Sequence, residues 1–401
     1  MSVSRVMVIG LDGGSLTLLE PLAENGVMPN LREVFRRGCY GTLRSTLPPF
    51  SAPAWVSFGS GKNPGKHGVF GFYRKSLGSF DRVPIDSSWV AARMLWDVLS
   101  EHGLESCVIN VPISYPPKPL KGVLVSDFLV TPRRDCEFTY PQEIKRELLD
   151  RVEGYHPAPF RAAAQSGEFL DEVLRWTERH EAANRYILRT YPWSFFVNNF
   201  QASDIVQHYF WDHLRPDRLL NGQGPFSRKL LEVYRLLDRI IGERLGLADN
   251  GTTVLLMSDH GFTDLRKFVY VNRWLRDQGL LVLSSKNLVQ RSLERAGISQ
   301  REIVRAIRRM DVFGLTDRMP LRRKWRLGTR LDQLIGGGVD WERTRAYSGD
   351  LYEEGVYINL RGREPFGIVR EGAGYEEVRE LILEGLAGLT DEATGAPVFH
   401  R

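Results

Sequence analysis

The chain has 401 residues, of which 42% are apolar and 26% are charged, and its formal net charge is +5 at pH 7. This length and composition suit one large globular domain, or a domain with a substantial insertion, and exclude a disordered or fibrous chain. A net charge this small over this length suits anionic substrates but does not indicate nucleic acid, so we expect no nucleic acid duplex among the partners.

The N-terminal region and the cysteines indicate the cellular compartment. The first apolar run, residues 6–11, follows a single arginine and ends at Asp12, so it is too short for a signal peptide or a membrane span. The three cysteines, Cys39, Cys107 and Cys136, are widely spaced and form no CxxC pair. They support neither a disulfide framework nor a cysteine metal site. We therefore expect a cytoplasmic protein.

Short apolar runs rich in Val, Ile and Phe alternate with helical patterns along the chain. We predict strands over residues 6–11, 106–111, 123–128, 193–199 and 252–257. Helices are predicted over residues 31–37, 90–102, 169–190, 205–214 and 226–245. This alternation is typical of buried parallel strands joined by crossover helices. The predicted fold class is α/β, a mostly parallel sheet flanked by helices, with cap insertions.

Two stretches differ from this alternation and divide the predicted core domain into residues 1–130, 191–290 and 340–401. Residues 131–190 combine Pro and Gly with a polar helix, which indicates a cap over the substrate side. Residues 291–339 form a predicted basic helical insertion. Within it, residues 292–330 carry basic side chains around Trp325, which suit either a solvated face or contact with an anionic membrane or partner surface.

Metal-type ligands follow three of the predicted strands. Asp12 follows the first strand, Asp204 follows the strand at 193–199, and Asp259 and His260 follow the strand at 252–257. In doubly wound sheets, functional groups gather beyond the carboxyl ends of the strands. Each Asp alone could be ordinary turn chemistry. Several carboxylates at one sheet edge would repel each other unless a cation neutralised them, so together they indicate a metal site.

Asp204 and His208 have a spacing that would let both side chains bind the same metal ion. If a helix begins near Asp204, the two side chains lie at positions i and i+4 and share one helix face. An Asp and a His placed this way are suitable ligands for a divalent metal. A lone DxxxH pair is more often a surface or cap interaction.

Ser51 is the candidate nucleophile. It stands just ahead of a predicted helix, where a metal could activate the hydroxyl and backbone N–H groups could attract an anionic phosphoryl group. The simpler interpretation is a helix N-cap, a position that serine favours.

These residues resemble the alkaline phosphatase superfamily, and most closely its type I phosphodiesterase/nucleotide pyrophosphatase branch with the related predicted phosphohydrolase/phosphomutase group. The matching motifs occur in the family's order, from residue 3 to about residue 370. They are Asp12-Gly13, Ser51-Ala52-Pro53-Ala54-Trp55, residues 60–68 (SGKNPGKHG), Asp204-x-x-x-His208, Ser258-Asp259-His260-Gly261-Phe262, and the stretches at 110–117 and 359–367.

The resemblance implies a metal-dependent hydrolase of phosphate esters, with a phosphodiester or nucleotide-type substrate and a phosphoseryl intermediate on Ser51. Two divalent ions, Zn²⁺ or Mn²⁺, would be its cofactors, and a small phosphorylated molecule its substrate. One ion would be held by Asp12, Asp259, His260 and the Ser51 hydroxyl, and the other by Asp204, His208 and a further histidine. The sequence departs from the family at that last ligand, because the only histidine after His260 is His400. Either His400 or a carboxylate such as Asp350 substitutes, or the chain is a truncated form whose second metal is bound weakly or not at all.

Other functions remain open. A phosphomutase of the same superfamily would share both metals and the serine, and a degenerate, non-catalytic member would lack the second metal. A sulfatase is disfavoured because Trp55 stands where that branch has its anion-gripping arginine. Dinucleotide binding is disfavoured because no GxGxxG follows the first strand.

Overall fold

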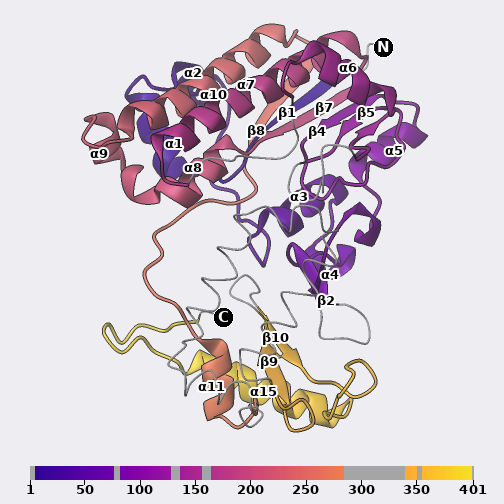
Figure 1. The fold of residues 1–401 in the computed structure, drawn as a ribbon, viewed down its shortest axis with the longest axis vertical. Coiled ribbons are helices and arrows are strands. Elements are labelled where there is room, and N and C mark those ends of the chain that lie inside the picture. Colours follow the sequence, from indigo (N-terminus) through magenta and orange to yellow (C-terminus); the bar gives the residue numbers. More distant parts are fainter. Residues whose placement is uncertain are drawn as a thin grey trace, which may run out of the picture. The chain divides into compact units, whose positions relative to one another are not determined.

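The computed structural model describes residues 5–75, 82–127, 136–155, 164–283, 339–349 and 355–399 (Figure 1). The chain divides into two compact units. The first consists of Met1–Phe72 and Pro84–Leu265, and the second of Tyr73–Val83 and Arg266–Arg401. Within the described ranges, no helix combines the length and apolar character that crossing a bilayer requires.

The elements of the first unit alternate between strands and helices. In chain order they are β1 (Arg5–Leu11), α1 (Leu16–Glu24), α2 (Pro29–Arg37), α3 (Ser51–Ser60), α4 (Pro64–His67), η1 (Ser87–Trp89), α5 (Leu95–Glu101), β4 (Ser106–Ile109), β5 (Gly122–Val125), β6 (Thr139–Tyr140), α6 (Glu143–Arg151), α7 (Gly167–Thr190), β7 (Phe195–Phe200), α8 (Ala202–Phe210), η2 (Trp211–His213), α9 (Pro216–Leu220), α10 (Ser227–Leu247) and β8 (Thr252–Met257).

The core of this unit is a six-stranded sheet in the order β6-β5-β4-β7-β1-β8. All neighbouring strands are parallel except β5 and β6, which are antiparallel. The central strand β1 lies between β7 and β8, with Leu11 beside Phe200 and Gly10 beside Met257. The carboxyl ends of these three strands therefore meet at one edge. This sheet and its flanking helices confirm the predicted fold class.

Helices cover both faces of the sheet because successive strand residues point to opposite sides. On β1, Ile9 packs in a cluster supplied by α1, α2, α7, α8, α9 and α10. Its neighbour Val8 faces the other side and packs with Trp55 of α3 and Trp96 of α5. Burial on both faces explains why these strands are apolar runs rather than alternating ones.

The second unit has two small sheets and two helices among its described residues. In the sheets, β2 (Tyr73–Lys75) pairs with β3 (Arg82–Pro84), and β9 (Ala346–Ser348) pairs antiparallel with β10 (Val356–Ile358). The helices are α11 (Val271–Asp277) and α15 (Ala373–Ala387). Leu275, Val378 and Ile382 join α11 and α15 in one core. The side-chain amide of Asn359 donates to the carbonyls of Trp341, Thr344 and Phe366 at 2.9, 2.8 and 3.1 Å. The 359–367 motif thus has a structural role in this unit.

The predicted strands are confirmed to within a few residues, but two predicted helix boundaries are wrong. The helix expected at 90–102 begins only at Leu95, because the Asp97 side chain accepts a hydrogen bond from the Met94 N–H at 2.9 Å and caps that start. The helix expected at 205–214 covers Ala202–Phe210. The sequence did not reveal β6 or the strands of the second unit, which have only two or three residues each.

The predicted domain division stays a prediction. The stretch predicted as a cap, 131–190, falls within the first unit, and its helix α7 packs against β4 and β7. The basic stretch at 292–330 lies outside the described residues.

Candidate active site

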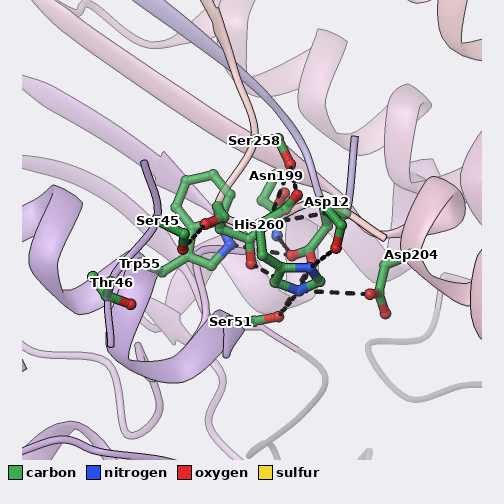
Figure 2. Close-up of polar contacts among 12 residues, drawn as sticks. Asp12, Ser45, Thr46, Ser51, Trp55, Asn199, Asp204, Ser258 and His260 are labelled. Atoms are coloured by element: carbon green, nitrogen blue, oxygen red, sulfur yellow. Dashed lines mark hydrogen bonds and ion pairs between the residues drawn. The ribbon is translucent and has the colours of Figure 1, made fainter. Parts of the chain in front are cut away.

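Asp12 comes directly after β1 and is 1% exposed. Its two carboxylate oxygens have different partners (Figure 2). Oδ1 accepts from the Ser51 hydroxyl at 3.2 Å. Oδ2 accepts from the Asn199 side-chain amide at 2.6 Å and from the Trp55 indole N–H at 3.1 Å. The carboxylate is thus held between three elements, β1, α3 and β7.

Ser51 is the first residue of α3, and Phe50 is the capping residue. The Phe50 side chain makes no cap hydrogen bond, and Ser51 lies one position inside the helix. Its hydroxyl lies 3.0 Å from Nε2 of His260 as well as 3.2 Å from Asp12. The interpretation as a plain N-cap is therefore wrong, since the hydroxyl points away from its own helix and toward the strand ends.

Asp259 and His260 follow β8. The Gly13 backbone N–H donates to Oδ1 of Asp259 at 3.1 Å, which ties the ends of β1 and β8 together. Nδ1 of His260 lies 3.0 Å from the Gly261 carbonyl. Because a carbonyl can only accept, the hydrogen-bond pattern assigns the proton to Nδ1. Nε2 then faces the carboxylates, at 3.4 Å from Asp259, 3.7 Å from Asp12 and 3.8 Å from Asp204.

Asp204 lies in the first turn of α8, directly after β7, and His208 lies one turn later. Oδ1 of Asp204 is 3.4 Å from Nε2 of His208, so the two share a helix face as the i,i+4 spacing predicts. The His208 side chain is 61% exposed. The neighbouring Asp204 carboxylate raises the pKa of the imidazole. This pair forms the open side of the cluster.

The cluster carries more negative charge than its surroundings neutralise. Burial raises the pKa of Asp12 well above its ordinary value, and the nearby Asp259 and Asp204 raise it further. Asp204 Oδ1 and Asp259 Oδ2 are buried and have no hydrogen-bond partner among the described residues. Asp12, Asp259 and His260 are close enough together to hold one metal ion, whose charge would neutralise part of this excess.

Hydrogen bonds to the backbone fix the loops that carry the residues of the cluster. The Ser203 hydroxyl donates to the Asp12 carbonyl at 2.7 Å, and the Gln207 amide donates to the Gly13 carbonyl at 2.8 Å. The Ser45 hydroxyl donates to the Asp259 carbonyl at 2.5 Å. The loops at Asp12 and Gly13 are therefore held by α8, and the loop at Asp259 is held by the segment before α3.

The structure brings five of the six candidate residues, Asp12, Ser51, Asp204, Asp259 and His260, around one point, and His208 joins them through Asp204. Their chemical roles stay predictions. His400 and Asp350, the candidates for the last ligand, lie outside the described residues. Asn110, the first residue of the 110–117 stretch, is 2% exposed, and its side-chain amide nitrogen lies 2.8 Å from Nδ1 of His180.

Sequence reasoning missed the residues that surround Asp12. Asn199 had a signal, because it is a carboxamide inside the apolar run of β7. Trp55 belongs to the motif at 51–55, but nothing in the sequence indicates that its indole bonds Asp12. Gly10 had no signal, since a glycine in a strand is compatible with ordinary packing.

The sequence matches the family described as type I phosphodiesterase / nucleotide pyrophosphatase over residues 6–320. No curated protein matches the chain. Two solved structures of phosphonoacetate hydrolase from Sinorhizobium meliloti 1021, in complex with phosphonoformate and with phosphonoacetate, are similar at 19% and 18% identity, with TM-scores of 0.49 and 0.47. Each similarity covers 69% of this chain and 62% of the hydrolase chain. Because the family match spans most of the sequence, the chain belongs to the type I phosphodiesterase/nucleotide pyrophosphatase family of the alkaline phosphatase superfamily.

Proposed function

We propose that the chain is a metal-dependent hydrolase of phosphate esters, of the phosphodiester or nucleotide type, that works through a phosphoseryl intermediate on Ser51. One observation carries this proposal. The Ser51 hydroxyl lies within hydrogen-bond distance of both Asp12 and His260, inside a cluster that includes Asp204 and Asp259. Family membership supports phosphate-ester chemistry for this arrangement.

The residues present fit divalent cations. Asp12, Asp259, His260 and the Ser51 hydroxyl would hold one ion, and Asp204 and His208 would hold part of the shell of a second. These nitrogen and oxygen ligands suit Zn²⁺ or Mn²⁺. When bound, the ions would favour ionisation of the Ser51 hydroxyl and neutralise charge on the phosphoryl and leaving oxygens.

The chain's own residues position the nucleophile and the substrate. Helix α3 begins at Ser51, so the backbone N–H groups of Ser51 and Ala52 have no partner within the helix and can bind a phosphoryl oxygen. Pro53 has no N–H, and the Ala54 N–H donates to the Phe50 carbonyl at 3.0 Å. Ser51 Oγ loses its proton to water and bonds to phosphorus as the bond to the leaving oxygen breaks, and that oxygen takes up a proton. Water then attacks the phosphoserine, the Oγ–P bond breaks, and Ser51 regains a proton.

The test is the metal content of the purified chain, combined with turnover of p-nitrophenyl phosphate and bis(p-nitrophenyl) phosphate in Mn²⁺ or Zn²⁺. We expect bound metal, and turnover that chelation removes and the same metal restores. A metal-loaded chain that cleaves neither mono- nor diesters would contradict the proposal.

The degenerate, non-catalytic alternative has one observation in its favour. Among the described residues, the one group of three or more close metal-type ligands is Asp12, Asp259 and His260. His208 is largely exposed, and a third ligand for its ion is not among the described residues. One metal per chain without turnover would favour this alternative, whereas two metals with turnover would favour the hydrolase. A phosphomutase remains a second candidate within the superfamily, and transfer of phosphate between hydroxyls without its release to water would indicate it.

A further inference from the structure

Asp12 presents only one of its two oxygens to the candidate metal site. Its Oδ2 already accepts two N–H groups, from Asn199 at 2.6 Å and from Trp55 at 3.1 Å. Its Oδ1 accepts only from Ser51, at 3.2 Å, and lies 3.7 Å from Nε2 of His260. The side chains of Asn199 and Trp55 thus make the two oxygens different, since both donate to Oδ2 and neither donates to Oδ1.

Trp55 comes from the same helix as the nucleophile. It lies four residues after Ser51 on α3, on the same helix face, and its side chain is fully buried against the sheet. One helix therefore supplies both the hydroxyl at Oδ1 and the indole N–H at Oδ2. Any rotation of the Asp12 carboxylate would break one of these bonds.

Gly10 provides the space for this arrangement. A Cβ built at Gly10 would lie 2.5 Å from Cη2 of the Trp55 indole and 2.9 Å from Oδ1 of Asn199. Contacts below 3.0 Å require something to shift, so any larger residue at this position would displace the indole, the carboxamide or both. Gly10, two residues before Asp12, is therefore needed for Trp55 and Asn199 to contact Asp12 in this way.

From these contacts we infer that Trp55 and Asn199 are positioning residues, which saturate Oδ2 of Asp12 and turn Oδ1 toward Ser51 as a single-oxygen ligand for a divalent cation. This inference rests on the proposed function, because it assigns Asp12 to a cation. Two N–H donors fix the carboxylate plane before any ion binds, which lowers the ordering cost of binding. A carboxylate free to rotate could instead take the ion through both oxygens and move it away from Ser51.

The test uses Mn²⁺ binding to the full chain, measured by titration calorimetry, in Trp55→Phe and Asn199→Leu. Each change removes one N–H donor from Oδ2 of Asp12. Trp55→Phe keeps an aromatic ring, and Asn199→Leu replaces the carboxamide with an apolar side chain of similar size. We expect Mn²⁺ to bind on the order of 10- to 100-fold more weakly in each variant. The double variant should lose less than the product of the two single losses, because both donors act on the same oxygen.

Two matched controls separate positioning from packing. Trp96→Phe removes a buried tryptophan from the same apolar cluster as Trp55, without touching Asp12. Asn198→Leu removes a fully buried carboxamide one residue from Asn199, on the opposite face of β7. Both controls should bind Mn²⁺ as the wild type does, even if they lower the melting temperature.

Crystal structures of metal-free Trp55→Phe and Asn199→Leu complete the test. We expect the Asp12 carboxylate to turn and the Ser51 Oγ–Asp12 Oδ1 contact to lengthen beyond 3.2 Å. Wild-type Mn²⁺ affinity in both variants would overturn the inference and leave the proposed function intact. If the wild type binds neither Mn²⁺ nor Zn²⁺, the proposed function fails. In that case the crystal structures alone test the positioning role of Trp55 and Asn199. If the Asp12 carboxylate has the same orientation in both variants as in the wild type, the inference is overturned.

Discussion

The hydroxyl oxygen of Ser51 lies 3.0 Å from Nε2 of His260, although the two residues are 209 positions apart in the chain. The contact exists because α3 packs on one face of the sheet while His260 follows β8, the strand next to β1. It brings a nucleophile-type hydroxyl to an imidazole nitrogen that also faces three carboxylates. This relationship carries the functional proposal and the first prediction.

Replacement of the nucleophile should remove chemistry without removing metal. Ser51→Ala keeps the carboxylates and His260, so we expect kcat to fall by about 10³-fold or more while the melting temperature still rises with Mn²⁺. Rapid acid quenching of the wild type should leave phosphate on the peptide that contains Ser51. The control is Ser60→Ala on the same helix, whose hydroxyl bonds its own Val56 carbonyl. Phosphorylated peptide from Ser51→Ala would disprove the assignment.

Asp12→Asn should have opposite effects on the metal-free and metal-loaded protein. Burial and the neighbouring Asp259 and Asp204 raise the pKa of Asp12, so the metal-free folded state disfavours the ionised form. This destabilisation is absent at low pH and develops as the pH rises through the raised pKa. Metal-free Asp12→Asn should therefore melt higher than the wild type at pH 8 and similarly at pH 4.

Excess Mn²⁺ should reverse that order. At 100 times its dissociation constant, an ion that binds only the folded state stabilises it by about 2.7 kcal/mol, and Asp12→Asn should gain less. Differential scanning fluorimetry at both pH values tests the metal-free prediction with EDTA and the metal-loaded prediction with Mn²⁺. A metal-free Asp12→Asn that melts below the wild type at pH 8 would show that the carboxylates do not repel each other.

His67 should make stability fall in mild acid. Its side chain is fully buried, contacts Ser57 Oγ at 2.9 Å through Nε2, and accepts from the Val69 N–H at 3.2 Å through Nδ1. Burial lowers the pKa of this imidazole below its ordinary value of 6.5. The unfolded chain therefore takes up a proton first, and stability is lost as the pH falls below about 6.5.

Urea unfolding of the wild type and of His67→Asn between pH 5 and pH 8 measures this effect. The slope of unfolding free energy against pH should become shallower in the variant, whatever its absolute stability. An equal slope in both proteins would mean that His67 binds its proton equally well in the folded and unfolded states.

The buried ion pair between α7 and α10 should be costly to break from one side. Arg244 is fully buried and bonds both oxygens of Glu181, at 3.0 and 2.6 Å. Arg244→Met leaves a buried carboxylate unpaired, so we expect a loss of about 3–5 kcal/mol in unfolding free energy. The double variant Arg244→Met/Glu181→Leu should recover much of that loss.

The exposed pair Arg36–Glu33 on α2 is the control for that measurement. Arg36→Ala should cost far less unfolding free energy than Arg244→Met, because solvent screens an exposed pair. If Arg244→Met and Arg36→Ala cost the same, the buried pair does not contribute as its geometry implies.

Gly385 should be intolerant of substitution in the second unit. A Cβ at this position would lie 2.3 Å from the Trp274 indole, so Gly385→Ala forces α15 and α11 apart. We expect a loss of about 1–3 kcal/mol. Gly374→Ala, on the same helix, meets only an ordinary contact of 3.6 Å and should be neutral or stabilising. Hydrogen exchange resolved by segment should show the loss in α11 and α15, and equal protection in both variants would contradict the close approach.

The sequence alone was sufficient for the parallel strands and for the candidate ligands. Strands buried on both faces are continuous apolar runs, so β1, β4, β5, β7 and β8 could be located from composition. Polar side chains directly after such runs must lie at the carboxyl edge of the sheet, which is why Asp12, Asp204 and Asp259 could be chosen. The i,i+4 spacing similarly placed His208 beside Asp204.

Only the tertiary structure decided which atoms meet. No local pattern indicates that Gly10 leaves space for Trp55, or that Trp55 and Asn199 occupy one oxygen of Asp12, because these contacts join three separate elements. The short strands of the second unit were missed for the same reason, since two or three residues carry too little periodicity to be recognised. Local sequence determines which way a side chain points from its own strand or helix. Which group it meets there depends on the packing of elements that are distant in the chain.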